Sequence, residues 1–422
     1  MGIALARLEY VTHTFFNVYL SEDGVLTEER QHRAPIDKLP QIFWSDGLGW
    51  AEANVWALTR AAEGIKLDTV KRNMKYLLTY ANYLEGAGLD WRDFPLFKEE
   101  QAIRKYRGEL VRRRDGKSIA PKTARNSMAS AIQFYRYADK QGLVNTTGPM
   151  WDDTVVQIQR CDIAGFKRSI SRNRSELSIP CRSVIGQTLE DGLLPLTKGN
   201  LATLLSYVKK HESQVLLHML TAGAFSGARI GTVTTMTVDC LDTDAEHGEV
   251  SGLYMIPVGP GTGIATKFDV TGRIPFPEAV LDDLRYYASS TERLLREAKA
   301  EKKHKRLLFL NKNGKPYTVD AVNRLVWDMR QRAVKHGLKF CQRLRFHQTR
   351  ATYGTWLMRF LLDNGAGSDA IRIVRDAMLH QSETTTMRYV KFLEMNKFGE
   401  IFAEEFNSTF TGMKRDWNAV EV

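Results

Sequence analysis

Four segments of the sequence contain side chains that could together act on a phosphate group. These segments are 226–230 with Arg229, 265–267 with Lys267, 345–350 with His347 and Arg350, and 378–389 with His380 and Tyr389. A guanidinium can hold two phosphate oxygens at once and stays charged at any ordinary pH. An imidazole exchanges protons near neutral pH, and a phenol can act as a nucleophile when a base or a positive field assists it. Such a set of groups could therefore cleave a phosphodiester bond.

Each segment taken alone also has an ordinary structural interpretation. An arginine that follows a glycine box, such as Arg229, is usually a surface salt-bridge residue, and Tyr389 in isolation is typical of a half-buried core residue. His347 and Arg350 lie one helical turn apart and share a face, which is a common chance pairing. The functional interpretation therefore depends on all the segments together and on their order along the chain.

Together and in this order, the six residues resemble the tyrosine recombinase (phage integrase) family. The family pattern is an arginine in a Gly-x-Arg box, a lysine on a β-hairpin, a His-x-x-Arg box, a histidine or tryptophan, and a tyrosine nine residues later. Here those positions read Arg229, Lys267, His347, Arg350, His380 and Tyr389. The neighbouring sequences HQTRATYGTWL and TTTMRYV also fit the family pattern. The resemblance covers about residues 194–392 and extends more loosely to residues 51–150.

The resemblance implies a mainly α fold with a helical core-binding (SAM-like) domain and a mixed α+β catalytic domain that contains a small antiparallel sheet. It implies a site-specific recombinase or integrase that cleaves and rejoins DNA through a 3′-phosphotyrosine, without metal, ATP or another cofactor. The implied partners are double-stranded DNA, further copies of the chain in a tetramer on two DNA sites, and accessory or partner recombinases. A bacterial, plasmid, phage or transposon origin fits this activity.

The expected roles of the residues follow from the charge changes in such a reaction. Arg229 and Arg350 suit the two non-bridging phosphate oxygens, which gain negative charge when phosphorus is attacked. A phenol has a pKa of about 10, so Tyr389 needs assistance, and His347 is the expected proton-handling neighbour. The resemblance assigns Lys267 to protonation of the departing 5′-oxygen, and it gives His380 a hydrogen bond to the scissile phosphate. The segments contain no cluster of carboxylates that could hold Mg²⁺, which favours a metal-free site.

Two positions depart from the family pattern, and one tyrosine competes with Tyr389. Leu379 stands where the family commonly has glycine, and Thr232 stands where an acidic residue often occurs. We expect these departures to change the positioning of the site more than the type of reaction. Tyr353 lies three residues after Arg350 and is the rival nucleophile; because the family commonly has an aromatic core residue there, we expect Tyr353 to pack.

The composition favours a polyanionic partner. The 422 residues include 60 Lys and Arg against 49 Asp and Glu, which gives a formal net charge of +11. Such an excess is typical of proteins that bind nucleic acid, although a merely basic surface is the alternative. Hydrophobic residues make up 43% of the chain, enough for buried cores. The length suggests two to four domains.

Several other classes are excluded by the sequence. Cys161, Cys181, Cys240 and Cys341 are far apart and form no CxxC pair, which argues against a zinc ribbon and a disulfide scaffold. No stretch approaches the roughly 20 apolar residues of a membrane helix. The N-terminus lacks the basic and apolar parts of a secretory signal. We therefore expect a cytoplasmic, nucleoid-associated bacterial protein with no membrane partner.

The pattern predicts four parts along the chain. These parts are a segment of unknown role with strand-like runs over 1–45, a helical core DNA-binding domain over 46–150, a basic linker over 151–193, and a catalytic domain with a C-terminal helical tail over 194–422. Basic residues of the helical domain and the linker are expected to contact phosphates, with a solvated basic face as the alternative for each. These residues are Lys71, Arg72, Lys75, Arg112, Arg113, Arg114, Lys122, Arg125, Lys167 and Arg168.

Hydrophobic spacing predicts the elements that must position these groups. Helices are expected over 67–81, 104–114, 122–140, 213–228, 278–300, 320–336, 347–362 and 369–378, with a further helix capped by Thr197. Strands are expected over 254–258, 273–276 and 307–310, with another between the first two at 266–268.

The C-terminal tail and the overall activity each leave alternatives open. Apolar residues recur at helical spacing in the tail at Phe398, Ile401, Phe402 and Phe406, and this helix could pack in cis or on a neighbouring protomer. A type IB topoisomerase-like enzyme would use the same cleavage chemistry but relax supercoils as a monomer without a defined site. A non-enzymatic DNA-binding accessory factor is the other alternative, against which the complete set of six residues argues.

Overall fold

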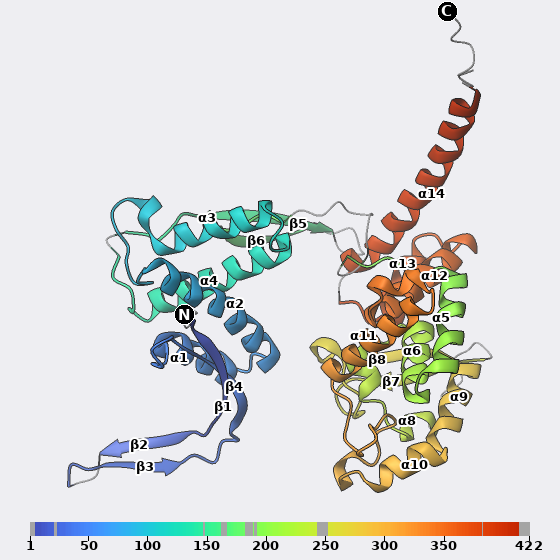
Figure 1. Cartoon of the computed structure of the whole chain (residues 1–422), viewed down its shortest axis with the longest axis horizontal. Coiled ribbons are helices and arrows are strands. Elements are labelled where there is room, and N and C mark those ends of the chain that lie inside the picture. Colours follow the sequence, from blue (N-terminus) through green and yellow to red (C-terminus); the bar gives the residue numbers. More distant parts are fainter. Residues whose placement is uncertain are drawn as a thin grey trace, which may run out of the picture. The chain divides into compact units, whose positions relative to one another are not determined.

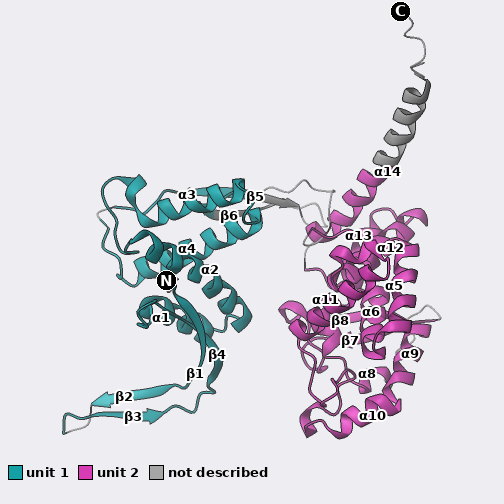
Figure 2. Cartoon of the chain, in the orientation of Figure 1, with its two compact units in different colours: residues 1–183 teal, residues 184–422 magenta. Residues whose placement is uncertain are grey.

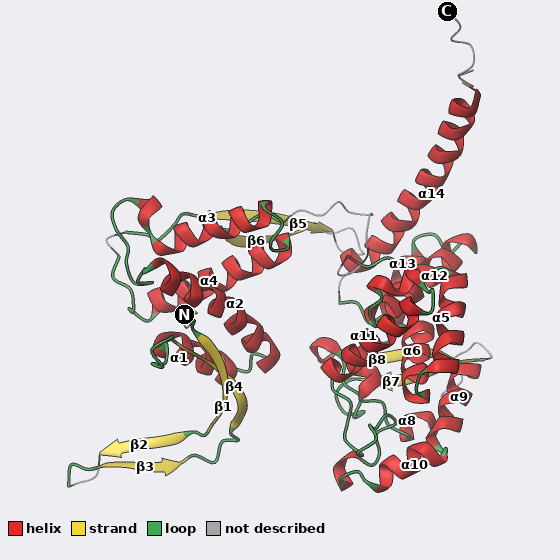
Figure 3. Cartoon of the chain, viewed as in Figure 1, coloured by secondary structure: helices red, strands yellow, loops and turns green. Residues whose placement is uncertain are grey.

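The chain forms two compact units, residues 1–183 and residues 184–422 (Figure 2). The structure is a computed structural model that describes residues 5–20, 23–146, 148–161, 167–181, 189, 192–242, 252–381 and 383–412. Helices dominate both units, and the strands form small antiparallel pairs (Figure 3). The mainly α fold with a small antiparallel sheet beside the predicted site is confirmed.

The first unit combines a helical bundle with three two-stranded antiparallel sheets in its described residues, β1–β4, β2–β3 and β5–β6. Its elements in chain order (Figure 1) are β1 (Arg7–His13), β2 (Phe16–Leu20), β3 (Leu26–Arg30), β4 (Ile36–Phe43), α1 (Ala51–Ala62), α2 (Leu67–Ala87), the 3₁₀ turn η1 (Lys98–Glu100), α3 (Ala102–Asp115), α4 (Pro121–Lys140), β5 (Asp153–Cys161) and β6 (Lys167–Ser175).

Aromatic side chains fill the core between the helices of the first unit. Trp50 lies 5.0 Å from Phe134 and 5.9 Å from Trp91, measured between ring centroids. The hydroxyls of Tyr80 on α2 and Tyr135 on α4 share a hydrogen bond of 2.6 Å, and burial raises the pKa of both phenols. The three helices predicted in this unit are confirmed, because their periodic apolar residues all face this core.

The N-terminal strands are attached to this bundle. Leu39 and Ile42 of β4 are fully buried. The side chain of Asn54 on α1 accepts a hydrogen bond from the Ile42 amide and donates one to the Ile42 carbonyl. Every residue of the strands β2 and β3 is exposed. The strand-like segment 1–45 is therefore partly built into the helical unit.

The range predicted as a basic linker, 151–193, contains folded structure. Strands β5 and β6 pair along their whole length, and Leu177 and Ile179 that follow them are buried in the core of the first unit. The predicted basic linker therefore contains a strand pair and a buried segment within residues 153–161 and 167–179. Its many arginines masked a run of β-branched residues that favours strand pairing.

The second unit holds all six predicted catalytic residues. Its elements are α5 (Lys198–His211), α6 (Gln214–Ser226), α7 (Ile230–Thr234), α8 (Asp239–Asp242), β7 (Leu253–Val258), the 3₁₀ turn η3 (Lys267–Asp269), β8 (Gly272–Pro277), α9 (Glu278–Ala288), α10 (Thr291–Ala298), the 3₁₀ turns η4 (Lys302–His304) and η5 (Lys339–Arg343), α11 (Val319–Lys335), α12 (His347–Asp363), α13 (Asp369–Ala377) and α14 (Glu383–Gly412).

Side chains cap the starts of four described helices in this unit, at Thr197, Ser213, Ser290 and Thr318. The Thr197 hydroxyl accepts a hydrogen bond of 3.2 Å from the Asn200 amide at the start of α5, so the predicted cap is confirmed. The single helix predicted over 278–300 was wrong, because Ser290 caps a second helix there. A serine at this position satisfies an amide that would otherwise lack an acceptor, so a new helix starts after it.

Two of the short strands predicted in this unit were wrong. Residues 266–268 fall mainly in the turn η3, because Phe268 has the left-handed φ of 65° and cannot extend a strand. Residues 307–310 form only isolated bridges, from Leu307 to Thr237 and from Leu310 to Pro316. The strands at 254–258 and 273–276 are confirmed as the antiparallel pair β7–β8.

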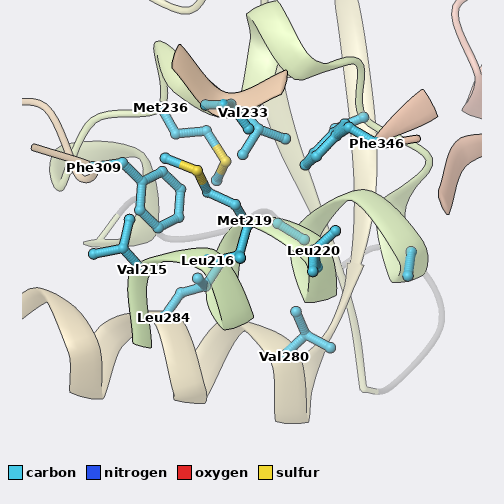
Figure 4. Close-up of a cluster of buried hydrophobic side chains, with 14 of the residues drawn as sticks. Val215, Leu216, Met219, Leu220, Val233, Met236, Val280, Leu284, Phe309 and Phe346 are labelled. Carbon is cyan, nitrogen blue, oxygen red and sulfur yellow. The ribbon is translucent and has the colours of Figure 1, made fainter. Parts of the chain in front are cut away.

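Helix α6 passes through the centre of the second core. Figure 4 shows Val215, Leu216, Met219 and Leu220 of this helix among apolar side chains from other elements, including Phe346 just before α12. Because α6 ends at Ser226, this packed core fixes the position of the Arg229 segment that follows it.

Two further expectations concern the membrane and the tail. None of the described helices is both long enough and apolar enough to cross a bilayer. The structure describes the backbone of α14 through Phe398, Ile401, Phe402 and Phe406 but not these side chains, so packing in cis or on a neighbour remains a prediction.

Candidate active site

Arg350 joins three of the predicted segments. Its side chain is 2% exposed, and its two terminal nitrogens donate hydrogen bonds of 2.6 Å to the carbonyls of Gly227 and Met378. Gly227 lies two residues before Arg229, and Met378 lies two residues before His380. The guanidinium on α12 therefore ties the segment after α6 and the segment after α13 to one point.

Arg229 lies beside this junction. It is half-buried at the start of α7 and lines a narrow crevice with Arg350, Thr232, Thr266 and Leu379. Two cationic side chains, Arg229 and Arg350, thus line one crevice. Since Thr266 directly precedes Lys267, the β7–β8 connection also borders the crevice.

Lys267 and His347 lie at the edges of this arrangement. Lys267 is exposed, and its described side-chain contact is with the Phe268 ring, whose centroid lies 5.0 Å from the ammonium nitrogen. His347 is half-buried at the first residue of α12, one turn before Arg350. His347 therefore lies on the same helix as Arg350, whereas the Lys267 ammonium lies over the ring of Phe268 in the turn η3.

His380 and Tyr389 lie side by side. Their rings stack with 6.1 Å between centroids and an angle of 22° between planes. His380 is 7% exposed, and its Nδ1 lies 2.9 Å from the hydroxyl of Thr386 on α14. Two side chains that are nine residues apart in sequence are therefore neighbours because the turn between α13 and α14 reverses the chain.

Tyr389 is fully buried within a small apolar cluster, which we call the α12–α14 cluster. Gly354 on α12 makes room for its ring, since a Cβ there would lie 2.7 Å from Tyr389 Cε1 and 2.5 Å from Met378 Sδ. The other members of the cluster are Leu189, Leu193, Ala351, Met358, Ala370, Val374, Met378 and Phe392. The phenol has no exposed surface in this conformation.

Tyr353, the rival nucleophile, packs over the Gly227 turn. Burial raises the pKa of Tyr353 to about 12, and the nearby Arg350 charge opposes that rise. The ring also lines a cavity of about 790 Å³ between β7, β8, α12 and α13. A phenol with a raised pKa is harder to ionise, which supports the packing role expected for Tyr353.

Gly227→Ala is expected to destabilise the second unit. Gly227 has a left-handed φ of +68°, and a Cβ there would lie 2.4 Å from Tyr353 Cδ1. The backbone strain and the overlap together should cost about 2 kcal/mol, or about 4–8 °C in Tm. Thermal unfolding monitored by circular dichroism measures this change. Gly231→Ala is the matched control, because a Cβ at Gly231 meets nothing within 4 Å; equal melting temperatures for the two variants would contradict the prediction.

The two departures from the family pattern have different surroundings. Leu379 has a left-handed φ of 50°, a conformation that favours glycine. Its side chain packs so closely on Gly272 of β8 that a Cβ on Gly272 would lie 2.4 Å from Leu379 Cδ2. Holding a leucine in this conformation costs about 1 kcal/mol or more. Thr232 is buried beside Arg229, and its amide donates a 2.9 Å hydrogen bond to the Arg229 carbonyl.

The described residues include no group of three or more His, Cys, Asp or Glu side chains placed to hold a metal ion. The carboxylates nearest His380 in sequence are paired with an arginine instead. Arg375 contacts Asp376 at 2.8 Å and Glu383 at 3.3 Å, and the Asp376 hydrogen bond is the main reason why the pKa of Arg375 is raised.

The predicted phosphate-binding residues all lie on the first unit. Arg72, Lys75, Arg113, Lys122 and Arg125 have exposed side chains. Three others contact neighbouring side chains: Lys71 is half-buried with its ammonium 5.8 Å from the Tyr10 ring centroid, Arg112 pairs with Glu109, and Arg114 pairs with Asp115. The structure does not describe the side chains of Lys167 and Arg168 on β6.

Sequence reasoning missed two residues that shape this site. Gly354 admits the Tyr389 ring, and Thr386 contacts His380. Thr386 could have been noticed because it lies three residues before Tyr389, on the same face of one helix. Gly354 gave a weaker signal, since a glycine inside a predicted helix has several explanations.

Comparisons with known proteins give a family match and structures of similar fold. Residues 195–395 match the model of the phage integrase family. Two structures of the Tn1549 transposon integrase in complex with a circular intermediate DNA have TM-scores of 0.52 and 0.51, at 15% identity over 80% of this chain and 94% of theirs. A lambda integrase dimer bound to a COC′ core site has a TM-score of 0.48 at 13% identity, with the same coverage. No curated protein matches the chain.

Proposed function

The chain belongs, through residues 195–395, to the phage integrase family of tyrosine recombinases, and we propose that it cleaves and rejoins DNA at a specific site through a 3′-phosphotyrosine on Tyr389. The observation that carries this proposal is the tie made by Arg350. Its two carbonyl contacts hold the Arg229 segment and the His380 segment together, and His380 stacks on Tyr389. Arg229, Arg350, His380 and Tyr389 thus belong to one connected arrangement, and His347 lies one turn before Arg350 on α12.

The proposed cleavage step transfers one phosphodiester from DNA to the protein. The phenol oxygen of Tyr389 attacks phosphorus, its proton passes to the His347 imidazole, and the bond from phosphorus to the 5′-oxygen breaks. Lys267 protonates the departing 5′-oxygen. Arg229, Arg350 and His380 hold the non-bridging oxygens, which carry the added negative charge in the transition state. Attack by a 5′-hydroxyl of a partner strand reverses these steps and reseals the DNA.

The position of Lys267 fits a role that begins when DNA is bound. The Lys267 side chain is exposed, and it is the preceding residue, Thr266, that lines the crevice. A four-carbon side chain on an exposed turn can swing towards a bound phosphate, and a lysine ammonium is a flexible proton donor. The exposed cations of α2, α3 and α4 are proposed to contact phosphates of the same duplex. Strand exchange between two duplexes needs four cleavages, so we propose a tetramer on two DNA sites.

Trapping the covalent intermediate tests this function. The substrate is a duplex that carries the recognition site, selected from random DNA by binding, with a nick that lets the short 5′-hydroxyl fragment diffuse away. We expect a protein–DNA adduct that survives denaturing electrophoresis and forms in excess EDTA, with the label retained only when it lies on the 3′-phosphate side. Absence of an adduct on a tightly bound site, or a link to the 5′ side, would contradict the proposal.

A variant of the first unit separates binding from cleavage in the same assay. Arg72→Ala with Lys75→Ala removes two exposed cations from α2. If both contact phosphates, the slope of log affinity against log salt should fall by about 2. An unchanged slope would restrict the DNA contact to other residues of the unit.

A further inference from the structure

We propose that Thr386 is a positioning residue that fixes the imidazole of His380 for its contact with the scissile phosphate. This inference rests on the proposed function, because it deepens the role of one residue in that reaction. It concerns a side chain that the family pattern of six residues does not include. The observation behind it is the hydrogen bond of 2.9 Å between the Thr386 hydroxyl and Nδ1 of His380.

Burial makes this contact a constraint on the ring. Thr386 is 0% exposed and His380 is 7% exposed, so water does not readily replace the hydroxyl. A buried hydrogen bond of this kind is costly to leave unmade. The ring is also stacked against Tyr389. Stacking restricts the tilt of the imidazole plane, and the hydroxyl restricts rotation within that plane.

The hydroxyl also decides which ring nitrogen serves the phosphate. Nδ1 and Nε2 lie on different sides of an imidazole, so a ring held through Nδ1 presents Nε2 in the opposite direction. A threonine hydroxyl can donate or accept, and the partner at one nitrogen sets which nitrogen carries the proton. Thr386 therefore assigns the phosphate contact to Nε2 and fixes the tautomer that makes it.

The position of Thr386 links this assignment to the nucleophile. Thr386 and Tyr389 are three residues apart on α14, so one turn of one helix carries both the orienting hydroxyl and the attacking phenol. His380 precedes that helix, outside it. In this structure α14 packs against α12 and α13, and the Thr386 hydroxyl on α14 holds the imidazole. Assembly of the phosphate site is thus coupled to the position of Tyr389.

Substitutions of Thr386 test the role by single-turnover cleavage of the nicked substrate. Thr386→Val keeps the shape and removes the hydroxyl, and we expect adduct formation to slow about 10–100-fold at unchanged DNA affinity, as for other residues that orient a histidine. Thr386→Ser restores the hydroxyl and should stay within about threefold of the wild type. Thr385→Val makes the same change on the same turn and serves as the control. In a His380→Ala background, Thr386→Val should have no further effect, because the two changes remove one interaction.

Nitrogen NMR of the His380 ring provides a second readout on the full chain. One tautomer should dominate in the wild type and in Thr386→Ser, and the two tautomers should mix in Thr386→Val. An unchanged tautomer in Thr386→Val, or effects of Thr386→Val and His380→Ala that simply add, would overturn the positioning role while the wild type still forms its adduct. Loss of the adduct in the wild type itself would instead overturn the proposed function, and this role with it.

Discussion

Tyr389→Phe is expected to form no covalent adduct with the nicked substrate. The substitution removes one oxygen and keeps the ring that packs against Gly354 and Met378, so the fold and the DNA affinity should be preserved. Without that oxygen no phosphotyrosine can form, and the rate should fall by at least about 10³-fold, as when other covalent nucleophiles are removed. Denaturing electrophoresis of the labelled substrate measures the loss.

Tyr353→Phe is the matched control for this experiment. It removes the same atom from a half-buried tyrosine on α12, whose pKa burial raises to about 12. We expect adduct formation close to that of the wild type. The assignment of the nucleophile would be reversed if Tyr353→Phe lost the adduct and Tyr389→Phe kept it.

Arg350→Lys should bind DNA and cleave it about 10²–10³-fold more slowly. A lysine keeps the positive charge, but its single nitrogen cannot reproduce the planar fork that reaches the Gly227 and Met378 carbonyls. The Arg229 and His380 segments then lose the hydrogen bonds that join them through Arg350, and the phosphate loses a bidentate partner. Cleavage rates at saturating protein, with affinity from gel shift, separate the two effects.

Arg350→Ala is a less informative variant, because Arg350 is buried and its removal leaves two carbonyls without their donors. It should lower the free energy of unfolding by about 2 kcal/mol or more in addition to stopping cleavage. Arg359→Lys is the control, since Arg359 is an exposed arginine on the same helix. A normal cleavage rate for Arg350→Lys would show that the guanidinium geometry is not needed.

The resemblance to the family singled out Arg229, Arg350 and Tyr389 as candidates from their residue types and order along the chain. It did not show which groups hold these side chains in place. The acceptors that tie Arg350 in place are backbone carbonyls, and every residue has one, so no pattern of side chains could identify Gly227 and Met378 as its partners. The complete burial of Tyr389 likewise depends on a glycine on another helix.

The errors in the predicted elements have a similar origin. Helices such as α2 were predicted well because their apolar residues repeat over many turns. The strand predicted over 266–268 is absent because Phe268 and Asp269 have a left-handed backbone. The turn imposes this conformation, and the types of these two residues were not enough to predict it. The β5–β6 strand pair was missed because the basic residues of this range indicated a linker, whereas pairing depends on the register of two strands.

The packing of Tyr389 with Leu189 and Leu193 has a consequence for the rate of any reaction at its oxygen. A side chain without exposed area cannot reach a phosphorus atom, so the conformation in which Tyr389 is buried cannot cleave DNA. The cleavage rate is then proportional to the fraction of molecules in which Tyr389 is exposed. Each 1.4 kcal/mol that favours the buried conformation reduces that fraction about tenfold. The packing of Leu189 and Leu193 in this cluster would in this way limit cleavage to molecules in which Tyr389 has become exposed.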